Sequence, residues 1–260
     1  MLDRPGSLIS VKGVSKTYSS SRKGSIRAID SVSFDVKAGE FVSIVGYSGC
    51  GKSTLLRIIT GLTKPTSGGV TISGEGVSSP VRGVGQVYQK PVLMPWRSAI
   101  ENVLVPIELL HGDKEKARQS ASTLLASVGL EGFEMLYPRE LSVGMQHRVS
   151  LARALIHDPS VLVMDEPFGS LDELTREEMA VELLKITERL GKTVIFVTHS
   201  VPEAVMLGDR VLVLSRRPSR LVADVAIEIP RPRTERVRSE PAFSAYCEEI
   251  RVHLSGGVAR

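Results

Sequence analysis

The sequence predicts an α/β fold, in which a parallel sheet follows an antiparallel β region and is interrupted by a helical insertion. Residues 161–166 and 193–199 are short apolar runs, and a helical pattern over 173–191 separates them. A strand, a crossover helix and a strand in this order predict parallel strands in one sheet. A glycine-rich loop over 46–54 joins another apolar run to another helical pattern. The carboxyl ends of such strands are expected at one common edge.

The elements around this loop follow from their residue patterns. Residues 8–18 and 26–46 alternate apolar and polar side chains and are broken by glycine and serine, as in antiparallel strands. The run "FVSIV" at 41–45 is continuously apolar, which predicts a strand covered on both faces. Residues 53–62 space their apolar side chains at helical intervals and end near a glycine. The loop therefore joins a buried strand to a helix.

Helical patterns dominate the middle of the chain. They cover residues 98–132, with a short break, and residues 143–158. No internal repeat is visible, so we interpret this stretch as an insertion into the α/β core rather than a separately linked domain. A last helix is expected over 243–254, near the C-terminus.

The composition limits the class of protein. The 260 residues are 42% hydrophobic with a net charge of +4, as in a soluble globular protein. No uncharged apolar run approaches the roughly 18 residues of a membrane span, so any role at a membrane is expected to be peripheral. Cys50 and Cys247 have no metal-ligand spacing and fit a reducing compartment. Seven arginines lie between residues 216 and 238, either in a solvated tail or on a surface that meets anionic lipid or a partner.

Residues 46–54, which we call the phosphate loop, match the spacing G-x-x-x-x-G-K-[ST] between a strand and a helix. Glycines let the backbone wrap closely around phosphate groups, and the helix N-terminus adds partial positive charge. The lysine is expected to reach the β and γ phosphates, and the serine hydroxyl to ligate Mg²⁺. The residues of this pattern are Gly46, Gly49, Gly51, Lys52 and Ser53. We expect Cys50 to be a small loop residue that is reactive when no nucleotide covers it.

Polar residues follow two of the other apolar runs. Asp165 ends the run 161–165, where a carboxylate can hold the Mg²⁺ shell. Glu166 comes next and can polarise a water molecule for attack, which indicates hydrolysis rather than binding alone. His199 ends the run in "FVTH" and is expected at the same sheet edge, where it can stabilise the γ-phosphate.

Six short motifs in a fixed order carry a family resemblance. "GYSGCGKST", "VYQ", "LSVGMQHR", "VLVMDEP", "SLD" and "VTHS" resemble the nucleotide-binding subunits of ABC transporters, over about residues 8–215. The resemblance implies a P-loop NTPase core of the ABC ATPase type, with an N-terminal antiparallel β subdomain and an inserted α-helical subdomain at about 90–150. It assigns residues 1–215 to the ATPase domain and leaves 216–260 as a C-terminal extension.

The resemblance also implies roles for single residues. Tyr18 stacks on the adenine ring, Gln89 contacts Mg²⁺ and the attacking water, and Asp172 communicates across a dimer. Glu166, His199, Gln89 and Lys52 are the implied catalytic residues, and Ser53, Gln89 and Asp165 the implied Mg²⁺ ligands. The nucleotide is held by Gly46, Tyr47, Ser48, Gly49, Cys50, Gly51, Lys52, Ser53 and Thr54 of one copy. It is covered by Ser142, Val143, Gly144 and Met145 of the other copy.

Val143 departs from the family signature LSGGQ, which has glycine in this place. We call residues 141–145 the signature turn. A β-branched residue restricts the backbone and crowds a close approach that glycine permits. If the φ angle of Val143 is positive, the residue is strained; if the backbone there is already helical, the effect is small. A working ATPase is expected, and a catalytically impaired regulatory subunit is the alternative.

Two further stretches resemble one group of importers. "LMPWRSAIENV" and the final "PRPR" are similar to subunits that serve nitrate, sulfonate and taurine uptake. The implied cofactors are ATP and Mg²⁺. The implied partners are a second copy of the chain in a head-to-tail dimer, transmembrane permease subunits and, indirectly, a solute-binding protein, with no nucleic acid. The implied location is peripheral, at the cytoplasmic face of a bacterial membrane. An ABC ATPase of a different transport system is a further alternative.

Overall fold

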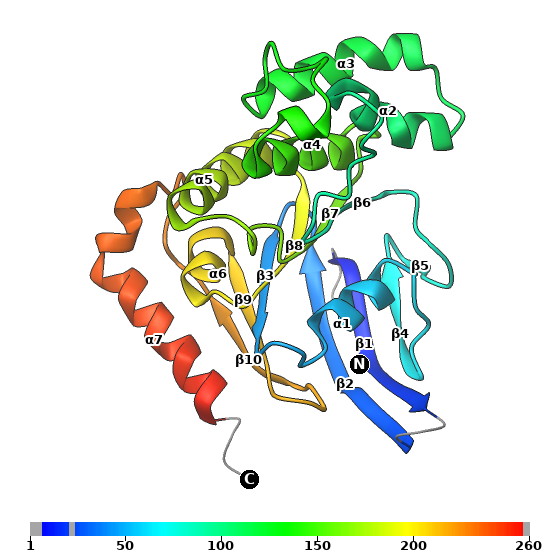
Figure 1. Ribbon diagram of the computed structural model, residues 1–260. Coiled ribbons are helices and arrows are strands. Elements are labelled where there is room, and N and C mark those ends of the chain that lie inside the picture. Colours follow the sequence, from blue (N-terminus) through cyan, green and yellow to red (C-terminus); the bar gives the residue numbers. More distant parts are fainter. Residues whose placement is uncertain (1–6, 21–23, 257–260) are drawn as a thin grey trace. The chain divides into compact units, whose positions relative to one another are not determined.

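The computed structural model describes residues 7–20 and 24–256. They form two compact units (Figure 1). The first unit contains the chain up to Val81 together with the chain from Thr193 onward, and the second contains Arg82–Lys192. No helix of the described residues is long and apolar enough to cross a membrane.

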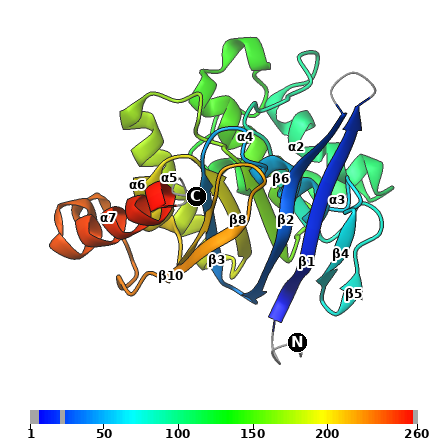
Figure 2. The same cartoon turned by 90° about the horizontal axis from the view of Figure 1, so that it is seen from below.

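The first unit begins with an antiparallel sheet in the strand order β2-β1-β4-β5. Its long members, β1 (Ser7–Ser20) and β2 (Gly24–Lys37), pair along most of their lengths, and β4 (Ser67–Ile72) and the short β5 (Glu75–Gly76) continue the sheet (Figure 2). Alternation in β2 places Phe34 and Val36 among the buried residues, while Asp35 between them is more exposed. The antiparallel strands predicted over residues 8–18 and 26–37 are confirmed, whereas residues 41–46, which the same prediction included, form a parallel strand.

A parallel sheet forms the core of the first unit. Strand β3 (Phe41–Gly46) lies between β8 (Thr193–Thr198) and β9 (Arg210–Leu214), parallel to both, and β10 (Leu221–Ala226) pairs antiparallel with β9. Every residue of β3 and β8 is buried, as the continuous apolar runs predict. Helices α1 (Lys52–Ile59) and α6 (Val201–Leu207) follow β3 and β8 directly.

The C-terminal part packs onto this core. The turn η2 (Glu235–Ser239) leads into α7 (Pro241–Gly256), which contacts α6 and β10. Figure 1 shows α7 beside α6. The expected helix over 243–254 is therefore confirmed.

The arginines of the basic segment are mostly bound, which corrects the expectation of a solvated tail. Arg233 is 3% exposed and donates to the carbonyl oxygens of Val205, Met206 and Gly208 at the end of α6. A cation at this position complements the negative end of the helix dipole. Arg231 pairs with Asp209. The "PRPR" sequence thus anchors the C-terminal part to the core.

The second unit combines two parallel strands with the helices of the insertion. Strands β6 (Val84–Val87) and β7 (Val161–Asp165) pair in parallel. Helices α2 (Ala99–Leu109), α3 (Lys114–Ser127) and α4 (Val143–Leu155) pack on one another, with the turn η1 (Pro138–Glu140) before α4 (Figure 1). Helix α5 (Glu173–Arg189) follows β7. Side-chain caps start these helices, including a capping box between Ser98 and Glu101.

Candidate nucleotide-binding site

The phosphate loop begins with a tight turn. The Cys50 N–H donates to the Tyr47 carbonyl oxygen at 3.2 Å, and Gly49 in third place has φ 71°. A β-turn with positive φ at this place is a type II turn, which calls for glycine there. Gly51 adopts φ 127°, and a Cβ atom on it would lie 2.9 Å from the Ser219 hydroxyl oxygen. Gly49 is therefore required by its backbone conformation, and Gly51 by both its conformation and the space around it.

Lys52 occupies the inside of the loop. Its Nζ donates to the carbonyl oxygens of Gly46 at 2.8 Å and Tyr47 at 3.1 Å, and the residue is 4% exposed. Lys52 is also the first residue of α1, and Ser53 and Thr54 complete its first turn. A held ammonium group, backbone N–H groups and a helix N-terminus together fit a polyphosphate group.

Cys50 does not behave as expected. Its thiol is 2% exposed, and burial raises its pKa. Because the thiolate is the reactive form, a buried thiol with a raised pKa is a poor nucleophile, which goes against the expectation of a reactive Cys50. The sulfur fills the space beside Gly46, where an added Cβ atom would lie 2.8 Å from it.

His199 lies at the same sheet edge as the loop. Val45 of β3 pairs with Thr198 of β8, so the residues that follow them along the chain, Gly46 and His199, are neighbours in register. The backbone on both sides of His199 is held: the Thr198 hydroxyl donates to the buried Glu203 carboxylate at 2.5 Å, and the Ser200 N–H donates to that hydroxyl at 3.0 Å. These hydrogen bonds fix the backbone position from which the His199 side chain extends.

The second unit brings its own candidate residues together. Val87 of β6 pairs with Met164 of β7, which places Gln89 near Asp165 and Glu166. A Cβ atom on Gly169 would lie 3.3 Å from the Gln89 amide nitrogen and 3.4 Å from the Glu166 carbonyl oxygen. Glu166 has φ 47°, a left-handed backbone that residues other than glycine rarely adopt. Backbone strain of this kind concentrates at functional sites, and it occurs here at the candidate catalytic carboxylate.

The signature turn starts a helix. Ser142 is the N-cap of α4 and accepts a hydrogen bond from the Met145 N–H at 3.2 Å. Val143 is the first helical residue, is 50% exposed and is not among the described residues with positive φ. The strained alternative for Val143 is therefore excluded, and the residue does not distort the turn. A Cβ atom on Gly144 would lie 3.2 Å from the Thr175 methyl carbon, so α4 and α5 approach closely here.

Asp172 caps α5. Its carboxylate accepts bonds from the Thr175 N–H at 3.0 Å and the Thr175 hydroxyl at 2.7 Å, and these bonds lower its pKa. A further contact, which the sequence did not reveal, connects α4 to the segment before α5. His147 of α4 is 2% exposed, and its Nε2 lies 3.0 Å from the Ser170 hydroxyl oxygen. Burial lowers the pKa of His147 to about 4, so the ring is neutral at neutral pH.

The metal ligands are expected to be few. Across residues 7–20 and 24–256, no group of three or more His, Cys, Asp or Glu side chains is arranged to hold a metal. Mg²⁺ in nucleotide sites is held by one or two carboxylates together with phosphate oxygens and water, so one carboxylate is enough for this ion. Binding of Mg²⁺ by Asp165, Ser53 and Gln89 stays a prediction. Tyr18, in β1, is 43% exposed with Lys16 Nζ at 5.1 Å from its ring centroid, and its stacking on adenine stays a prediction.

Comparison with known proteins decides the family. The family described as ABC transporter matches residues 29–169. The chain belongs to the ABC transporter family. As an ABC ATPase it binds ATP and hydrolyses it with Mg²⁺, and the resemblance found in the six motifs is confirmed.

Relatives of this ABC protein cover nearly all of it. The nitrate import ATP-binding protein NrtD of Synechocystis sp. is 42% identical over 90% of this chain and 91% of its own length. The taurine import ATP-binding protein TauB of Rhizobium johnstonii is 44% identical over 88% of this chain and 89% of its own length. A solved dimeric ATP-binding cassette in a post-hydrolysis state, bound to ADP and Pi, is 34% identical with a TM-score of 0.75. That match covers 85% of this chain and 100% of the cassette, which confirms the P-loop ABC ATPase fold.

Proposed function

We propose that the chain is the ATP-hydrolysing subunit of an importer for a small anion or organic solute, such as nitrate, an alkanesulfonate or taurine. The observation that carries this proposal is the closed phosphate loop around Lys52, in a chain whose relatives are import ATP-binding proteins for nitrate and taurine. The solute class rests on those relatives, because nothing in an ATPase subunit contacts the solute.

Two copies are proposed to meet head to tail. The phosphate loop of each copy then faces the signature turn of the other, so that two ATP molecules are buried in the dimer. The dimeric cassette among the solved relatives supports this arrangement. Ser142 and the N-terminus of α4 present N–H groups and a positive dipole end, which favour a phosphate group. Asp172 lies at the start of α5, next to this turn, where it can respond to the partner copy.

Each catalytic role is proposed from chemistry and position. ATP with Mg²⁺ supplies the phosphoryl group and neutralises part of its charge. Glu166 accepts a hydrogen bond from the attacking water and orients it, and the Gln89 amide positions the same water and the Mg²⁺ shell. Lys52 and His199 donate to the transferring phosphoryl oxygens, where negative charge develops in the transition state. Asp165 and Ser53 would be ligands of the Mg²⁺ ion.

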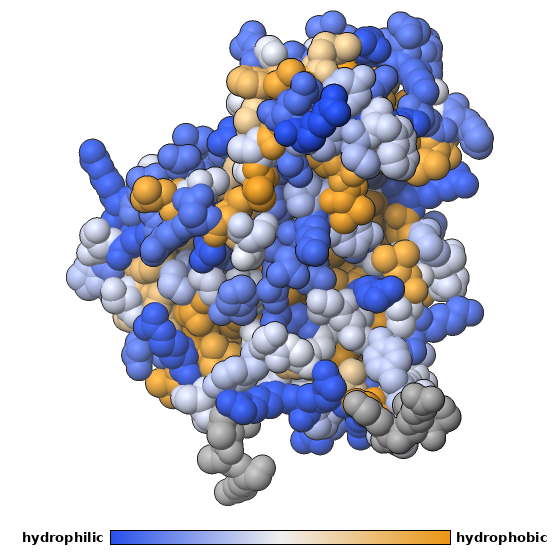
Figure 3. Space-filling view, viewed as in Figure 1, coloured by the Kyte–Doolittle hydropathy of each residue, from blue (hydrophilic) through white to orange (hydrophobic). Residues whose placement is uncertain are grey.

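The permease is proposed to bind an apolar surface of the second unit. Orange side chains reach the surface in the upper part of Figure 3, where the helices of this unit lie. Trp96 is 72% exposed and Met135 is 63% exposed. The segments that carry them are hydrogen-bonded to each other, because the Ala99 N–H donates to the Leu136 carbonyl oxygen at 2.8 Å. Exposed apolar residues grouped in this way mark interaction surfaces.

The buried Asn102 amide fixes the "LMPW" part of this surface. Its side chain accepts from the Met94 N–H at 2.8 Å and donates to the Arg97 oxygen at 3.0 Å, so it holds the turn that presents Trp96. A permease bound here would place the ATPase peripherally at the cytoplasmic face of the membrane. A solute-binding protein would then act through the permease.

Reconstitution tests the proposed function. The chain is assembled in lipid vesicles with its permease and solute-binding protein. Movement of nitrate, taurine and an alkanesulfonate across the membrane is measured with ATP supplied on the side of the ATPase. The proposal expects ATP-dependent movement of one of these solutes toward the ATPase side. Movement away from the ATPase side, or ATP hydrolysis with no response to any of the three, contradicts it.

A further inference from the structure

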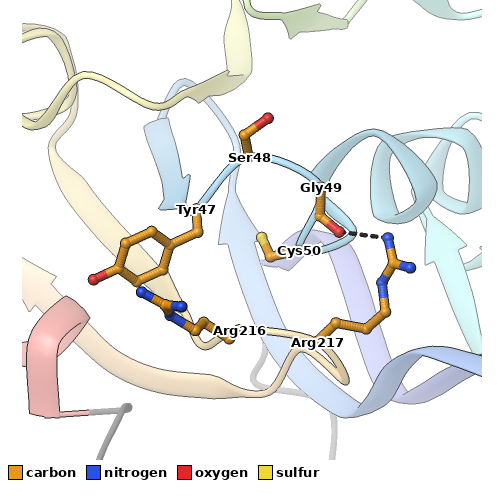
Figure 4. A pocket seen from close by; sticks show the side chains of 6 residues that line it. All are labelled: Tyr47, Ser48, Gly49, Cys50, Arg216 and Arg217. Carbon is orange, nitrogen blue, oxygen red and sulfur yellow. Dashed lines mark hydrogen bonds between the residues drawn. The ribbon is translucent and has the colours of Figure 1, made fainter.

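The turn between β9 and β10 lies directly against the phosphate loop. Figure 4 shows Arg216 and Arg217 of this turn with Tyr47, Ser48, Gly49 and Cys50 of the loop. These six residues line a cavity of about 510 Å³, all of it within the first unit. A cavity of this size is in the range of ligand sites.

Two contacts join the arginines to the loop. Arg217 Nη2 donates to the Gly49 carbonyl oxygen at 2.6 Å, and the Arg216 guanidinium lies over the Tyr47 ring at 4.3 Å from its centroid (Figure 4). The Gly49 carbonyl and the Cys50 N–H belong to one planar trans peptide, so a bond that fixes the first also fixes the direction of the second. Arg217 therefore fixes the peptide whose Cys50 N–H donates to the Tyr47 carbonyl oxygen, and so holds the turn at the start of the phosphate loop.

The turn that carries the arginines is firmly anchored. Ser219, which is fully buried, donates from its N–H to the Ala28 oxygen at 3.0 Å and accepts from the Asp30 N–H at 2.9 Å. Its hydroxyl also donates to the Ala28 oxygen at 3.1 Å, next to the position where a side chain on Gly51 would collide. These bonds hold the backbone of the turn at Ser219, so the exposed Arg216 and Arg217 start from a fixed position beside the loop.

The charges of the two arginines are not compensated within the described part of the chain. The neighbouring arginines each have a carboxylate: Arg210 pairs with Asp224, and Arg220 with Asp30. Neither Arg216 nor Arg217 forms an ion pair with a carboxylate of residues 7–20 or 24–256; their contacts are an aromatic ring and a carbonyl. Unpaired guanidinium groups beside a phosphate-binding loop raise the local concentration of polyanions.

We propose that Arg216 and Arg217 are nucleotide-affinity residues, which hold the outer side of the phosphate loop and supply it with two positive charges for the polyphosphate. This inference rests on the proposed function, since it assigns new residues to the same site. Arg217 acts as a positioning residue through the Gly49 peptide, while Arg216 acts through its charge and through Tyr47. Both effects exist in the ground state, so they change affinity for MgATP rather than the rate of the chemical step.

Direct binding of MgATP to the purified chain tests the proposal. Arg216→Ala and Arg217→Ala are each expected to weaken binding about tenfold at low salt, with kcat in the permease complex changed less than about twofold. Arg216→Lys keeps the charge and is expected to restore most of the affinity. Arg236→Ala removes an exposed arginine of the same segment and is the matched control, with native affinity expected. Raising the salt concentration should narrow the difference between the native chain and Arg216→Ala.

The outcomes separate this inference from the proposed function. If the native chain binds MgATP and both alanine variants bind it equally well, the inference is wrong and the proposed function stands. Equal weakening by Arg236→Ala also contradicts the inference, because it points to the general charge of the segment. If the native chain itself does not bind MgATP, the proposed function is wrong.

Discussion

Val143 provides a sharp test, because the family signature has glycine in its place. It starts α4 without positive φ and is 50% exposed, so glycine in its place releases no strain. Replacing it by glycine loses about half of a valine burial, about 0.8 kcal/mol, and about 0.3 kcal/mol of helix propensity. We therefore expect Val143→Gly to lower the free energy of unfolding by about 1 kcal/mol. Turnover is expected to change less than about twofold.

The assay combines urea unfolding of the isolated chain with phosphate release by the permease complex. Val143→Ala is the matched control, because it removes the β-branch and keeps the helix propensity high. A strained Val143 would give the opposite result: glycine would then raise the free energy of unfolding by about 1–3 kcal/mol. Val143→Gly that is more stable than the native chain and turns over at least tenfold faster would refute the reasoning.

Three further predictions concern buried side chains. Asn102→Leu leaves the Met94 N–H without its hydrogen-bond acceptor. The variant is expected to lose the stimulation of ATP hydrolysis by the permease, while the isolated chain still binds ATP. Unchanged stimulation would contradict the role given to the "LMPW" turn. Arg233→Leu is expected to cost about 3 kcal/mol or more in urea unfolding, against little for Arg236→Leu, because the α6 carbonyls lose their donor. His147 has its pKa lowered from 6.5 to about 4 by burial, so the unfolded chain takes up the proton first as pH falls. The free energy of unfolding should therefore fall by about 3 kcal/mol at most across that window, with a shallower fall in His147→Gln; identical slopes would count against it.

Local pattern was sufficient for the elements that hold the site. The apolar run at 41–45, the glycine spacing at 46–51 and the parallel strands were readable because each depends on residues close in sequence. The same holds for the helix that starts at Val143, since Ser142 is a strong N-cap residue. Whether Val143 is strained depended only on the sign of its φ angle, which the sequence does not give.

Contacts between distant residues were not readable from the sequence. Arg217 and Gly49 are 168 residues apart, and no local sequence pattern predicts which carbonyl group an arginine will bind. Arg233 was counted as part of a basic tail because charge composition does not reveal which carbonyls a cation will cap. Cys50 was expected to be reactive when no nucleotide covers it, whereas the folded loop itself leaves its side chain only 2% exposed.

Phosphate release by the native chain and by Glu166→Gln, each purified with its permease, tests the central claim most directly. The Gln variant keeps the size and the backbone of Glu166 but cannot accept the proton or orient the water as a carboxylate does. We expect it to bind MgATP with native affinity and to lose at least about a hundredfold in turnover. Equal turnover of the two forms would contradict the account of this chain as an ATPase that works through Glu166.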